Sequence, residues 1–213
     1  MTPTRWIWPL LISAFFSLPA AASDDGWVLR EDRNGIVVHT RQEPGSPHWR
    51  YRGIGYADRP VEQVVMMMRD LDHLEDWLDK AYDTAMVREI DARTRLVYMK
   101  IETPAIPDRD LIVSQQFEQV GAREFRVYLR GYPDELPAQD GLVRIPYYDG
   151  FWHLTAEGER TRIEYQGQLD PGGWLVPTFV TNLLVSDVPY NSIRKIAAYP
   201  YGPYLVDLGF LKQ

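Results

Sequence analysis

The sequence predicts an α+β domain in which a curved antiparallel sheet wraps around a long C-terminal helix and leaves an internal cavity. Residues 84–170 largely alternate apolar and polar side chains, the period of β-strands. Residues 176–199 then carry apolar side chains at helical spacing. Because short turns separate the strands, we expect an antiparallel meander. One helix seldom fills the concave side of such a sheet, so a cavity is expected between the two.

The first 22 residues differ in composition from the rest of the chain. They contain one charged residue, Arg5, followed by an apolar run from Ile7 to Leu18 and small residues up to Ala22. This order is typical of a secretory signal peptide cleaved after Ala22, and the run is short for a bilayer span. We therefore expect a mature domain of residues 23–213 that is periplasmic or secreted. An uncleaved N-terminal anchor is the alternative.

The composition narrows the classes of function. The chain has 213 residues, of which 45% are hydrophobic, enough for one domain with a sizeable core. Its formal net charge of −7 argues against a nucleic-acid partner and against binding anionic membranes by charge alone. The absence of cysteine excludes disulfides and thiolate metal sites. We expect a monomer.

The N-terminal half of the domain predicts two strands and a helix. The strands are expected over residues 35–41 and 48–57, joined by a turn containing Pro44 and Gly45. Pro60 in a first turn and apolar residues at 3–4 spacing then predict a helix over residues 61–78. Period-two patterning predicts further strands over residues 84–91, 94–102, 109–119, 124–131, 142–155 and 161–170.

The last predicted element follows a Gly-rich turn that contains Gly172 and Gly173. Helical spacing places Asp187 on the apolar face of this closing helix. A carboxylate there needs a partner, so Asp187 either orients a polar head group or caps a new helical segment with Pro189 in its first turn. The residues of this face expected to pack in the core and to contact a ligand are Phe179, Val180, Leu183 and Leu184.

Three stretches resemble the START domain family, the steroidogenic-acute-regulatory-type lipid-transfer domains. "PAIPDRDLIVSQQ" (104–116) is similar to the family's Pro-rich loop and the Arg-Asp pair that opens a strand. "YYDGFWHLTA" (147–156) is similar to its Gly-aromatic-Trp strand, and "YQGQLDPGGWLVPTFVTNLL" (165–184) to its Gly-rich turn and the start of its closing helix. The likeness covers about residues 27–199 and implies a helix-grip fold that binds lipid in an internal cavity. Pro189 departs from the family's more regular closing helix.

The resemblance also implies which residues meet the ligand. Arg109 with Asp110 is expected mainly to tie the 103–108 loop to the sheet, and alternatively to steer a head group. That loop and the closing helix would form the cavity mouth, with Ile106 exposed toward a membrane. The inward-facing strand residues expected at the ligand are Val97, Met99, Ile101, Leu111, Val113, Val127, Trp152 and Tyr165.

Three functional hypotheses follow. The first is a carrier of a lipid or other hydrophobic small molecule that contacts membranes transiently and needs no cofactor. The second is a cyclase-like or hydrolase-like enzyme in the same cavity, although the sequence has no catalytic signature. The third is a filled-core interaction module without a lipid-sized chamber. His73 and Asp76 are too few for a metal site and fit a solvated helix face.

Overall fold

The computed structural model describes residues 26–42, 44–45, 49–173, 176–200, 202 and 207–212. Within these residues, ten strands form one sheet in the order β1-β2-β3-β10-β9-β7-β6-β5-β4, and β8 pairs with β6 off this path. All neighbouring strands are antiparallel except the β6–β8 pair. The expected signal peptide and the turn residues Trp174 and Leu175 lie outside the described residues.

The elements have the following bounds. The strands are β1 (Val28–Arg33), β2 (Ile36–Gln42), β3 (Trp49–Ala57), β4 (Ala81–Asp91), β5 (Thr94–Ile101), β6 (Arg109–Gly121), β7 (Glu124–Gly131), β8 (Val143–Arg144), β9 (Tyr147–Glu157) and β10 (Arg160–Asp170). The helices are α1 (Val61–Arg69), α2 (Leu74–Trp77), α3 (Thr178–Asn182), the π-helix η1 (Leu183–Asp187), α4 (Val188–Ala198) and the 3₁₀-helix η2 (Gly209–Lys212).

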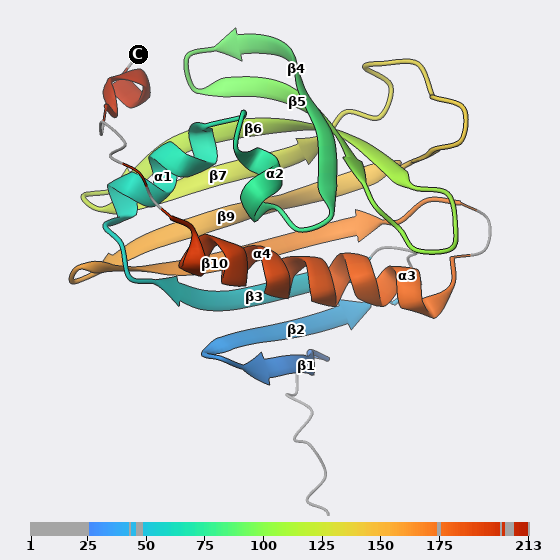
Figure 1. The fold of residues 1–213 in the computed structure, drawn as a ribbon, viewed down its shortest axis with the longest axis horizontal. Coiled ribbons are helices and arrows are strands. Elements are labelled where there is room, and N and C mark those ends of the chain that lie inside the picture. Colours follow the sequence, from blue (N-terminus) through green and yellow to red (C-terminus); the bar gives the residue numbers. More distant parts are fainter. Residues whose placement is uncertain are drawn as a thin grey trace, which may run out of the picture.

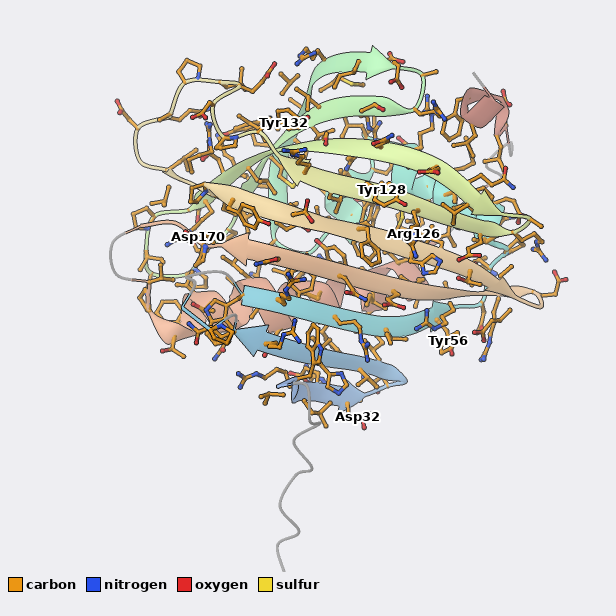
Figure 2. All side chains as sticks on the ribbon, turned by 180° about the vertical axis from the view of Figure 1, so that it is seen from behind. Asp32, Tyr56, Arg126, Tyr128, Tyr132 and Asp170 are labelled. Atoms are coloured by element: carbon orange, nitrogen blue, oxygen red, sulfur yellow. The ribbon has the colours of Figure 1, made fainter. Side chains whose placement is uncertain are left out.

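The predicted architecture is confirmed. The sheet curves around the closing helix, which is formed by α3, η1 and α4 in succession and crosses the concave face in front of β10 and β3 (Figure 1). Figure 2 shows the convex face, where Tyr56, Arg126 and Tyr128 lie on the side away from the closing helix. The core therefore sits between one face of the sheet and the helices.

Two predicted elements are divided in the structure. The helix expected over residues 61–78 ends at Asp70, whose backbone is extended and whose Oδ1 accepts a hydrogen bond from the Asp72 N–H (3.2 Å). Such an Asx turn offers the backbone an alternative to the helical ladder. The strand expected over residues 142–155 is divided into β8 and β9 around Pro146, which has no N–H to donate. Strand β1 was not predicted.

The closing helix passes through Pro189 without a break. Asp187 and Val188 keep helical backbone angles, and the five residues of η1 form a π-helical turn just before the proline. A π turn absorbs one extra residue, which accommodates a position that cannot donate a backbone hydrogen bond. A new α-helical segment, α4, begins at Val188 with Asp187 at its N-cap position and Pro189 in its first turn, as the second alternative predicted. Asp187 makes no capping hydrogen bond, however, and its side chain is exposed.

Two glycines let the closing helix approach the sheet. Gly53 and Gly55 of β3 face inward, beneath the fully buried Ile193 of α4. A Cβ at Gly55 would lie 2.5 Å from Ile193 Cγ2, and one at Gly53 would lie 2.8 Å from Ile193 Cδ1. The backbone of β3 is therefore in direct contact with the helix, and any side chain here would push the helix outward.

Candidate ligand cavity

An apolar cavity lies between the concave face of the sheet, α2 and the closing helix. Its wall is almost entirely carbon, supplied by β3, β5, β6, β7, β9 and β10 on one side and by Leu184 and Val188 on the other. Its volume is about 50 Å³. Pockets that hold small molecules usually measure about 300–1,000 Å³, so the expected lipid-sized chamber is not open in this conformation.

Four aromatic side chains form one continuous wall of the cavity. The Trp152 indole stacks on the Tyr165 ring, with centroids 3.6 Å apart and planes 8° from parallel. Trp77 meets Trp152 edge to face at 5.8 Å, and Tyr51 meets Tyr165 edge to face at 4.9 Å. Because the strand register places Trp152 opposite Tyr165, this wall follows directly from the β9–β10 pairing.

Three buried tyrosine hydroxyls meet inside this cavity. Tyr148 Oη lies 2.7 Å from Tyr51 Oη and 2.8 Å from Tyr165 Oη. We call Tyr51, Tyr148 and Tyr165 the tyrosine cluster. Gly167 makes room for it, since a Cβ there would lie 2.4 Å from Tyr51 Oη. Burial, reinforced by the neighbouring hydroxyls, raises the pKa of Tyr51 and of Tyr148 well above the usual value, so both stay neutral.

A polar group at the rim joins α4 to the segment between α2 and β4. The Asp79 carboxylate is 2.9 Å from Lys195 Nζ and accepts a hydrogen bond from Asn191 Nδ2 (3.0 Å). The Asp79 backbone N–H donates to Ser192 Oγ (3.0 Å). We call these four residues the rim latch. Asp79 also lines the cavity, so the rim latch lies beside the chamber and joins the helix to residues 78–81 there.

The β5–β6 loop is held by its own polar residues. Asp108 accepts hydrogen bonds from Tyr82 Oη (2.6 Å) and from the Thr103 N–H (2.7 Å). Burial raises the pKa of Asp108, but these hydrogen bonds outweigh it and leave the pKa below its usual value. The expectation of an exposed Ile106 is wrong, because this side chain is half-buried and packs against the core.

Arg109 ties this loop to the turn before the closing helix. It is 3% exposed, and its guanidinium donates to the carbonyls of Pro107 (2.7 Å) and Pro171 (3.5 Å). Its neighbour Asp110 is paired with Arg144 rather than with Arg109 (2.8 Å). Arg109 does not line the cavity, so the geometry favours its structural role over contact with a head group.

The structure brings together half of the residues expected at the ligand. Met99, Ile101, Leu111, Val113, Trp152, Tyr165 and Leu184 line the cavity. Val97, Val127, Val180 and Leu183 are buried in the core without lining it. Phe179 is 48% exposed and Asp187 is exposed, so neither faces the chamber.

Several cavity residues were missed by the sequence analysis. Tyr148 shares its strand face with Trp152, four residues on, and Tyr51 alternates with the inward Gly53, so strand alternation contains a signal for both. Trp77 lies within the segment where a single helix was expected and Asp79 follows it directly, and no local signal marks either residue. The other missed residues include Leu78, Gln115, Ile145, Leu169 and Val188.

Comparisons with known proteins agree with this fold. No family model matches the chain. An uncharacterized protein of Pseudomonas aeruginosa is 25% identical over 187 residues, which cover 87% of this chain and 92% of that protein. Among solved structures, the STAR-related lipid transfer protein from Xanthomonas axonopodis is 27% identical with a TM-score of 0.73, over 82% of this chain and 98% of that one.

More distant structures share the fold alone. Human StAR-related lipid transfer protein 5 is 15% identical with a TM-score of 0.68, over 83% of this chain and 89% of that one. The Zhui aromatase/cyclase from a Streptomyces species is 13% identical with a TM-score of 0.53, over 71% of this chain and 92% of that one. The resemblance to START domains is therefore confirmed, and the chain has their helix-grip fold.

Two further observations concern only the described residues. None of their helices is both long and apolar enough to cross a membrane. Nor do three or more potential histidine, aspartate or glutamate ligands gather in one place among them.

Proposed function

We propose that the protein binds a lipid or similar hydrophobic molecule between its sheet and its closing helix, and carries it between membranes. The observation that carries this proposal is a carbon-walled cavity shared by the concave face and the lid. The START fold supports it, since the Xanthomonas axonopodis and human relatives in structure are lipid transfer proteins. Apolar burial would supply the affinity, at about 25 cal/mol per Å² removed from water.

Uptake requires the cavity to widen from about 50 Å³. A twelve-carbon chain gains roughly 10 kcal/mol when it leaves water for an apolar site. The rim latch opposes this only weakly, because the Lys195 side chain is 33% exposed and such ion pairs contribute about 1 kcal/mol or less. We therefore assign opening to separation of α4 from residues 78–81, with the π turn η1 as the part of the lid that bends.

Membrane contact is assigned to the start of the closing helix. Phe179 on α3 is 48% exposed, whereas Ile106 packs against the core. An exposed aromatic side chain on the lid suits shallow insertion between lipid head groups. We further propose that residues 1–22 direct the protein to the periplasm or outside the cell, where it acts as a monomer without a nucleic-acid partner.

Transfer between vesicles tests this function. Donor vesicles carrying a pyrene-labelled lipid are mixed with unlabelled acceptors, and loss of excimer fluorescence is followed with and without the protein. We expect transfer to accelerate in proportion to protein concentration. If neither lipid transfer nor displacement of a neutral dye from the cavity is detected, the protein is not a carrier of hydrophobic ligands.

A cavity enzyme is the second candidate. The tyrosine cluster places three hydroxyls in an apolar chamber, and an aromatase/cyclase shares the fold. Against it, no described histidine lines the cavity, and its one carboxylate, Asp79, is already paired with Lys195. The fate of a bound ligand distinguishes the two candidate functions, because a carrier releases its ligand chemically unchanged and an enzyme does not.

A further inference from the structure

The tyrosine cluster retains hydrogen-bonding capacity that the protein does not use. Three hydroxyls offer three protons and six lone pairs. The two hydrogen bonds through Tyr148 consume two of the protons. Tyr51 and Tyr165 also interact with each other directly. Several lone pairs are still left on the three hydroxyls, which belong to cavity-lining residues that are at most 6% exposed. Besides these tyrosines, the polar side chains that line the cavity are those of Trp77, Trp152, Asp79 and Gln115, and the rest of its wall is apolar.

A second cavity residue has an unused donor. The Trp77 side chain lines the chamber and is 2% exposed, and its indole Nε1–H has no hydrogen-bond partner among the described residues. Leaving a buried N–H unpaired costs free energy, so such groups call for an explanation. Trp77 is connected to the tyrosine cluster by ring contacts: it meets Trp152 edge to face, and Trp152 stacks on Tyr165.

The charge of the wall restricts the ligand further. Among the residues that line the cavity, the one acidic side chain is Asp79 and none is basic, and the Asp79 carboxylate already has Lys195 and Asn191 as partners. A charged group carried into the chamber would therefore lose its hydration without gaining a counter-ion. A neutral oxygen, in contrast, needs only one or two hydrogen bonds, which the tyrosine hydroxyls and the indole can supply.

Building on the proposed function, we infer that the ligand is an uncharged apolar molecule whose buried end carries a hydroxyl or carbonyl oxygen. That oxygen bonds the tyrosine cluster, and the Trp77 N–H donates to the same end of the ligand once the cavity has widened. Fatty-acid anions and charged head groups do not enter the chamber. Gly167 contributes to this selectivity, since only a residue without a side chain leaves room for the Tyr51 hydroxyl.

The test compares probes of one length that differ only at the end. Dodecan-1-ol, dodecan-2-one, dodecane and dodecanoate compete with the neutral dye N-phenyl-1-naphthylamine for the full-length protein at pH 8. Each titration is repeated with Tyr148→Phe and, as a second variant, Trp77→Phe. The matched control is Tyr190→Phe, which removes a buried hydroxyl that accepts a hydrogen bond from Asn34 Nδ2 (2.9 Å) away from the cavity.

We expect Tyr148→Phe to weaken the binding of dodecan-1-ol and of dodecan-2-one about 3- to 10-fold, which is the effect of losing one hydrogen bond. The affinity for dodecane should stay within about twofold of that of the wild type. Trp77→Phe should weaken the binding of the ketone by a similar factor, and Tyr190→Phe should leave all four affinities unchanged. The wild-type protein should bind dodecanoate at least about tenfold more weakly than the alcohol. Equal losses for dodecane and the alcohol, or a dodecanoate affinity equal to that of the alcohol, would overturn the inference while the carrier function stands. If no probe displaces the dye, the carrier function itself fails.

Discussion

The contact of the closing helix with the glycines of β3 predicts a measurable coupling. Gly55→Ala places a Cβ 2.5 Å from Ile193 Cγ2 and 3.1 Å from Ile36 Cγ1. Overpacking of this kind costs about 1–3 kcal/mol, and the lower backbone entropy of alanine returns about 0.5–1 kcal/mol. We therefore expect Gly55→Ala to lower the free energy of unfolding by about 1–2 kcal/mol.

A double-mutant cycle combines Gly55→Ala with a second substitution that removes the clashing side chain of Ile193. Ile193 is fully buried, so Ile193→Ala alone should cost about 2–5 kcal/mol. In the double variant the new methyl group occupies part of the space that Ile193 vacates, and the clash with Cγ2 is gone. The double variant should therefore be more stable than the sum of the single effects predicts by at least about 1 kcal/mol.

Urea unfolding followed by circular dichroism gives the four free energies. Leu96→Ala serves as the control partner, because β5 is five strands from β3 in the sheet, and its effect should add to that of Gly55→Ala. If the Gly55 and Ile193 effects also add to within about 0.5 kcal/mol, the closing helix does not rest on β3 as described.

Three further predictions concern the cavity, its rim and the adjoining loop. Leu184→Trp fills the chamber and should abolish dye uptake, whereas the exposed Phe179→Trp should preserve it; equal uptake by both would place the binding site elsewhere. Lys195→Met removes the ion pair of the buried Asp79, so it should lower the free energy of unfolding by about 1 kcal/mol and speed dye release several-fold in stopped-flow measurements. An unchanged release rate would show that the rim latch takes no part in opening the cavity. Asp108 has a lowered pKa, so its stabilising contribution is complete above about pH 4 and is lost as the pH falls through its folded value. Asp108→Asn should therefore flatten the acid side of the stability profile, and an unaltered profile would contradict this role.

The sheet was more predictable from the sequence than the helices were. On a strand the face of each residue is fixed by parity, so Met99 and Ile101 on β5 and Trp152 on β9 were placed correctly on the concave side. The same rule fails on the closing helix. The π turn shifts the register after Asn182, so Leu184 faces the cavity, Leu183 does not, and Asp187 turns to solvent.

Other features of the site depend on contacts that no local pattern encodes. Asp79 and Lys195 are 116 positions apart and meet only because α4 crosses the concave face. The first helix ends at Asp70, where the Asp72 N–H donates to the Asp70 side chain and not to a helical carbonyl. The apolar periodicity of residues 61–78 continues past this point and gives no sign of the break. The cavity volume is set by how side chains from ten elements interdigitate, so a sequence that predicts the chamber does not predict its size.

Native mass spectrometry of the protein purified without detergent tests most directly whether the chamber accepts a hydrophobic guest. The protein should emerge with an added mass of one apolar, uncharged compound, or gain one after incubation with vesicles, and Leu184→Trp should emerge bare. A wild-type protein that remains at its bare mass under both conditions, while folded by circular dichroism, would contradict a ligand-carrying cavity between the sheet and the closing helix.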